Sequence, residues 1–117
     1  VFDMLTGDGA LPQKLRDMAA FVSEMYGGGG APCLISSMMI SPTAGPKAID
    51  TVRSIMTEWI NALGQALRAQ GLPADEAKQR ATAALVEIQG GLVVARATGD
   101  ITIFETALKS AIARLHV

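Results

Sequence analysis

The chain has 117 residues, of which 50% are hydrophobic and 18% are charged, and its formal net charge is −1. This length suits one domain with its own core, and the absence of a basic block excludes an electrostatic footprint for nucleic acid on this chain. The single cysteine excludes an internal disulfide framework and suits a reducing cytosol, and no apolar run is long enough to span a bilayer. We therefore expect a cytoplasmic protein whose apolar excess is hidden by self-association.

The first half of the chain predicts one amphipathic helix and one short buried helix. Over residues 12–26, apolar side chains recur at steps of three and four residues, which is the helical period. This apolar face consists of Leu15, Met18, Val22 and Met25. Four consecutive glycines at 27–30 end the helix, because glycine is costly in regular structure. The apolar run at 33–40 predicts a short buried helix that stops near Pro42.

A longer helix is predicted over residues 46–70, with Pro46 in its first turn. One stripe of this helix is apolar. The stripe consists of Ile49, Val52, Met56, Trp59, Ile60, Leu63 and Leu67. Gly71 and Pro73 predict its end, since glycine suits a left-handed cap and proline does not continue a helix.

The helix predicted over residues 75–98 is apolar nearly all round. Between residues 81 and 97 the only polar residues are Thr82, Glu87, Gln89 and Arg96. A helix without a polar face must be covered on both sides, and a chain of this length covers one side only. We therefore expect a homodimer. Gly90 and Gly91 each cost about 1 kcal/mol relative to Ala, and they indicate either a close helix–helix contact or tolerated helix weakness.

Gly99 closes that helix, and the last helix has two candidate starts. Asp100 could be the N-cap, or Thr102 could be, with Glu105 completing a capping box. No stretch alternates with period two, so we expect no sheet. The predicted fold is an all-α bundle of about five or six helices, the last two of which form a four-helix dimer interface with a second copy.

The predicted dimer interface combines the apolar belt of the 75–98 helix with the stripe of the last helix. Such an obligate interface is expected to be large and apolar. Its residues are Leu85, Val86, Gln89, Gly90, Val93, Val94, Phe104, Leu108 and Ile112.

Motifs for catalysis and metal binding are mostly missing. His116 lies next to the C-terminus and has no catalytic partner near it in the sequence. Cys33 has no CxxC companion, so we interpret Cys33 as a buried structural thiol. The glycine run lacks the Lys-Ser/Thr of a phosphate-binding loop. We expect no enzyme, no metal and no cofactor. Six methionines lie in the first half with Phe21, Tyr26 and Trp59, and this pattern fits an ordinary core and an adaptable pocket equally well.

The segment EIQGGLVVARATGDITIFETAL, residues 87–108, resembles the last two helices of TetR-family transcriptional regulators. That family commonly shows a glycine, an aliphatic run, an Ala-Arg pair, a Gly-Asp turn and a final amphipathic helix. The upstream helix, the entry at Cys33 and the helix that carries Trp59 are also similar. The family's N-terminal helix-turn-helix has no counterpart here, and the sequence does not start with Met, so we expect a part of a longer protein.

The resemblance implies that residues 1–117 are the C-terminal ligand-binding and dimerisation domain of a ligand-responsive repressor. DNA would be bound only through the N-terminal domain. The resemblance favours a pocket for a small hydrophobic effector, in which the indole N–H of Trp59 needs a partner such as a ligand oxygen, Ser36 or Ser37. The expected lining is Met18, Phe21, Val22, Met25, Cys33, Met38, Met56, Trp59 and Ile60. The alternative is a dimeric helical interaction module without a ligand.

Overall fold

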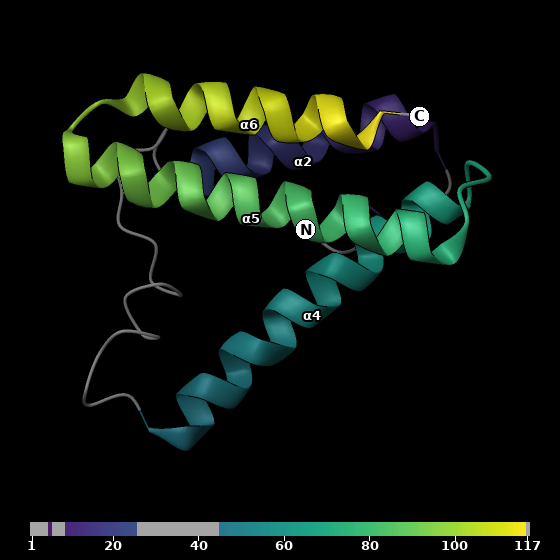
Figure 1. Ribbon diagram of the computed structural model, residues 1–117, viewed down its shortest axis with the longest axis horizontal. Coiled ribbons are helices and arrows are strands. Elements are labelled where there is room, and N and C mark those ends of the chain that lie inside the picture. The colour runs from purple at the N-terminus through teal and green to yellow at the C-terminus, as the bar shows by residue number, and fades with distance from the viewer. Residues whose placement is uncertain (1–4, 6–8, 26–44, 117) are drawn as a thin grey trace.

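The computed structural model describes Leu5, residues 9–25 and residues 45–116. Within this part of the chain the regular structure is entirely helical, which confirms the all-α prediction. The helices are α2 (Leu11–Met25), α4 (Pro46–Arg68), α5 (Ala74–Thr98) and α6 (Ile101–Leu115) (Figure 1). The predicted helix at 33–40 lies outside the described residues, so the total of five or six helices stays a prediction.

The two C-terminal helices form an antiparallel pair, and the other two pack against it. α5 and α6 run side by side along their lengths, with α2 behind them, and α4 joins α5 near the start of α5 and diverges from it at an angle (Figure 1). α5 is therefore the central helix, since it contacts α6 on one side and α4 on the other. Among the described helices, none combines the length and apolar character that a bilayer crossing requires.

The turn between α5 and α6 is set by two adjacent residues. Gly99 has a φ of 74°, in the left-handed region that favours glycine, and its N–H donates to the carbonyl of Ala95 at 2.8 Å. Asp100 is the N-cap of α6, because its carboxylate accepts from the backbone N–H of Thr102 at 3.0 Å. The alternative prediction, a capping box starting at Thr102, is wrong: the Thr102 hydroxyl donates to the same Asp100 oxygen at 2.6 Å.

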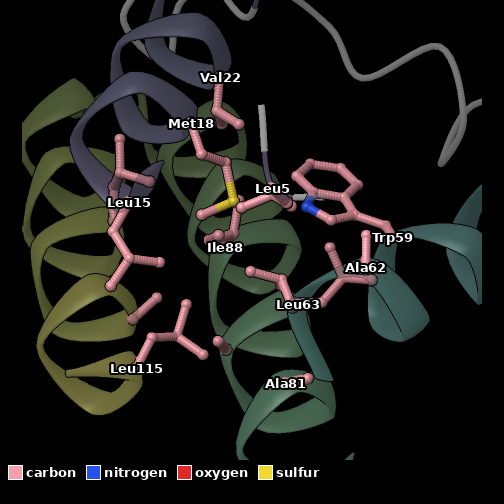
Figure 2. Packing of buried hydrophobic residues seen from close by; sticks show 14 of the residues in the cluster. Leu5, Leu15, Met18, Val22, Trp59, Ala62, Leu63, Ala81, Ile88 and Leu115 are labelled. Carbon is pink, nitrogen blue, oxygen red and sulfur yellow. The ribbon is translucent and has the colours of Figure 1, made fainter. Parts of the chain in front are cut away.

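The core lies where the four helices meet. Each contributes fully buried side chains, among them Leu15 and Met18 from α2, Leu63 from α4, Ile88 from α5 and Leu115 from α6 (Figure 2). No polar or charged residue is buried within the described part of the chain. Apolar burial is therefore what holds these helices together.

Gly91 accounts for the close approach of α5 and α6. It is buried, and a Cβ added to it would clash with the Cβ of Ala107 on α6. Gly90, in contrast, is exposed, and an added Cβ would meet nothing within 4 Å. The prediction of a close helix–helix contact is thus confirmed for Gly91, between two helices of one chain, and stays a prediction for Gly90.

Candidate effector site and dimer surface

Trp59 carries the one buried polar atom without a partner in the described part of the chain. Its side chain lies on α4 and faces the core cluster, with the residue 2% exposed (Figure 2). The indole Nε1 finds no hydrogen-bond acceptor among the described residues. Leaving a buried donor unpaired costs about 1–3 kcal/mol, so such groups normally have a partner.

The structure places some of the predicted pocket residues in the same buried cluster as this indole. Met18 and Val22 of α2 are fully buried in the same cluster as Trp59 (Figure 2). Phe21 is 37% exposed, so part of its ring lies at the surface instead. Cys33, Met38 and the two candidate acceptors Ser36 and Ser37 lie outside the described residues, as does the side chain of Met25.

The remaining two predicted pocket residues, Met56 and Ile60, are half-buried on α4. They pack against the core on one side and line an apolar groove between α4 and α5 on the other. The groove is lined by Met56, Ile60, Leu85, Val86, Gln89, Gly90, Val93 and Val94. It therefore joins two residues that the sequence assigned to the pocket with six that it assigned to the dimer interface. The sequence could not predict this groove, because it does not encode locally the angle at which α4 packs on α5.

The predicted dimer residues divide into a surface set and a core set. Val86, Val93 and Val94 on α5 are 65%, 51% and 47% exposed. Phe104 and Leu108 of α6 are buried inside the protomer, where they belong to the core cluster. Ordinary soluble proteins expose single apolar side chains, but neighbouring ones along a groove form a patch of the kind that partners cover.

Two ion pairs on α5 and α6 are accessible to water. Arg80 pairs with Glu76 at 2.9 Å within α5, and Arg114 of α6 pairs with Glu87 of α5 at 3.5 Å. Pairs of this kind contribute little to stability, since water screens them. Within the described ranges, no three His, Cys, Asp or Glu side chains gather into a potential metal site.

The chain matches a family of regulatory domains. Residues 30–110 match the model of the C-terminal domain of LmrA/YxaF-like transcriptional regulators. The chain belongs to this TetR family, in which the matched part is a regulatory domain and not an enzyme. More particularly, it is a C-terminal domain of the LmrA/YxaF-like type. Comparison with curated proteins and with solved structures found no match.

Proposed function

We propose that residues 1–117 form the effector-binding and dimerisation domain of a ligand-responsive transcriptional repressor of the cytoplasm. The effector is a small hydrophobic molecule, and DNA is bound by the N-terminal helix-turn-helix of the parent protein. The family match supports the general role. The observation that carries the effector site is the unpartnered N–H of Trp59, buried among Met18, Val22 and other apolar side chains.

An effector at this place has a defined chemistry. The surrounding side chains are apolar, so most of the ligand surface is apolar as well. One oxygen that accepts from Trp59 Nε1 would supply the hydrogen bond that the described residues do not provide. We therefore propose a hydrophobic effector with at least one carbonyl, ether or phenolic oxygen.

The arrangement of α4 supplies a route from binding to regulation. The C-terminal end of α4 packs near the start of α5, and the N-terminal end of α4 diverges from the α5–α6 pair (Figure 1). A ligand in contact with Trp59 touches α4 directly. It changes the position of α4 only as far as it binds one arrangement more tightly than another. In the full protein that difference would set the spacing of the DNA-binding domains.

The fluorescence of Trp59 tests the effector site, because Trp59 is the only tryptophan of the sequence. A panel of lipophilic ketones, esters and phenols is titrated into the protein while emission and melting temperature are followed. A binding member should shift or quench the emission. At a hundredfold excess over Kd it should also raise the free energy of unfolding by about 2.7 kcal/mol, and the melting temperature rises accordingly.

Trp59→Phe keeps an aromatic ring and removes the N–H. Calorimetry should show binding of the active panel member weakened about five- to tenfold, as expected for one lost hydrogen bond. Ile101→Val, at the exposed start of α6, is the matched control and should bind as the unaltered protein does. If no panel member perturbs Trp59 and native mass spectrometry finds nothing bound, the effector site is contradicted.

The second candidate function is a dimeric helical interaction module without a ligand. It is favoured by the position of Trp59 within a continuous cluster of buried side chains that includes Leu5, Leu63 and Ile88. The two functions differ in one observable. An experimental structure with a void or bound molecule beside the indole supports the effector site, and close packing there by residues 26–44 supports the interaction module.

A further inference from the structure

We propose that a small hydroxycarboxylate binds in the pocket between the C-terminal half of α4 and the first residues of α5. Trp59 does not line this pocket, so the inference does not depend on the effector site proposed above. The pocket has a volume of about 310 Å³, which suits a small molecule. Its lining consists of Ile60, Asn61, Gly64, Gln65, Arg68, Ala74, Asp75 and Lys78.

Two helices and a short turn form the walls of the pocket. The α4 residues follow one another at steps of one and three, so they share one face of that helix, and the α5 residues lie at its start (Figure 1). In the turn between the helices, the N–H of Gly71 donates to the carbonyl of Arg68 at 2.9 Å. The N–H of Ala77 donates to the carbonyl of Pro73, also at 2.9 Å. These bonds hold the two walls in place before a ligand binds, which lowers the cost of binding.

Gly64 leaves open space beside the α4 backbone. It is buried, yet a Cβ added to it would meet nothing within 4 Å. Alanine at this place would favour the helix by about 1 kcal/mol, and the described residues offer no packing reason against it. Gly91 is different, because a Cβ there would clash with Ala107. A ligand that lies against the α4 backbone explains Gly64, since a side chain would occupy the same space.

The charges in the lining indicate a carboxylate. Arg68 and Lys78 come from different helices, and neither forms an ion pair within the described part of the chain, although Asp75 lines the same pocket. The planar guanidinium of Arg68 matches a carboxylate with two parallel hydrogen bonds, and Lys78 adds a second positive charge. Two cations and one carboxylate leave the lining with one net positive charge, which a monocarboxylate balances.

The other polar groups indicate a hydroxyl on the same molecule. An ionised Asp75 only accepts hydrogen bonds, so it repels a bare carboxylate and needs a donor from the ligand. Asn61 and Gln65 each carry an amide that donates and accepts. A hydroxyl can donate to Asp75 while its oxygen accepts from one of these amides. Ile60 supplies an apolar wall for the carbon chain.

Calorimetric titration of the unaltered protein tests the ligand class with matched pairs of sodium salts. The pairs are lactate and propionate, 3-hydroxybutyrate and butyrate, and 2-hydroxyhexanoate and hexanoate. At least one hydroxy acid should bind with a dissociation constant of about 1 mM or lower, because exposed charges are screened by water. Its partner without the hydroxyl should bind about tenfold more weakly. If no hydroxy acid binds, or if the partner acid or inorganic phosphate binds equally well, the proposal is overturned.

Variants of the lining test the location. Arg68→Gln should weaken binding of the active hydroxy acid about tenfold or more, whereas Arg53→Gln, elsewhere on α4, should leave it unchanged. Gly64→Leu fills the pocket and should abolish binding, whereas Ser54→Leu, exposed on α4, should not. If Gly64→Leu does not fold, Gly64→Ala takes its place and should weaken binding while it raises the free energy of unfolding. Binding that survives either Arg68→Gln or the Gly64 variant overturns the site.

Discussion

At the scale of single residues, Gly91 sets the distance between α5 and α6. Gly91→Ala gains about 1 kcal/mol of helix propensity, but the new Cβ clashes with the Cβ of Ala107, which moves only with the α6 backbone. Overpacking of this kind costs about 1–3 kcal/mol. We expect a net loss of stability of about 1 kcal/mol, measured by urea unfolding.

Two further variants control this prediction. Gly64→Ala makes the same change inside α4 at a place where an added Cβ meets nothing within 4 Å, and it should stabilise the protein. Ala107→Gly should restore much of the stability lost in Gly91→Ala, because it removes the atom in conflict. Equal effects of Gly91→Ala and Gly64→Ala would contradict the close contact.

The sequence predicted the burial of individual residues better than their partners. Trp59 lies on the apolar stripe of its helix, so its burial followed from the helical period alone. Which acceptor its N–H meets depends on elements far away in the sequence, and no local pattern carries that information. Gly90 and Gly91 are adjacent and chemically identical, and only the position of α6 assigns them to different faces.

At the scale of elements, the start of α6 depends on Asp100. Its pKa is held below its ordinary value of 3.8, first by the Thr102 hydroxyl and second by the Thr102 backbone N–H, both of which donate to the carboxylate. Because the folded-state pKa is depressed, the stabilisation is complete above 3.8 and is lost as the pH falls through the folded value.

Asp100→Ala should therefore lower the melting temperature at neutral pH, and the difference from the unaltered protein should shrink in acid. Asp100→Asn keeps a good capping side chain without the titrating group, so its melting temperature should fall less at neutral pH, and in acid the unaltered protein should approach it or fall below it. Thermal melts followed by circular dichroism across this pH range measure both effects. A constant difference between Asp100→Ala and the unaltered protein would exclude a charged cap.

The bounds predicted for α2, α4 and α5, and the predicted start of α6, lie within two residues of those in the structure, for a local reason. Pro46, Gly71 and Gly99 act on the backbone where they stand, so helix ends can be predicted without knowledge of the tertiary fold. The interface could not be predicted in the same way. α5 is apolar nearly all round, and its division into core and surface depends on where α4 and α6 pack.

At the scale of the whole molecule, part of the apolar excess in the composition lies on the exposed surface of α5. Ile88 and Leu92 turn inward to the core, whereas Val86, Val93 and Val94 remain exposed on the same helix. Neighbouring apolar side chains beside an apolar groove favour association, because covering them removes their surface from water. Self-association is therefore the property on which the proposed regulation depends.

Sedimentation velocity of the unaltered protein at micromolar concentration tests this property most directly. The chain has a mass of 12.2 kDa, and we expect a single species of twice that mass. The dimer should persist at high salt, because apolar contacts are not screened. A single species of 12.2 kDa under these conditions would contradict the account.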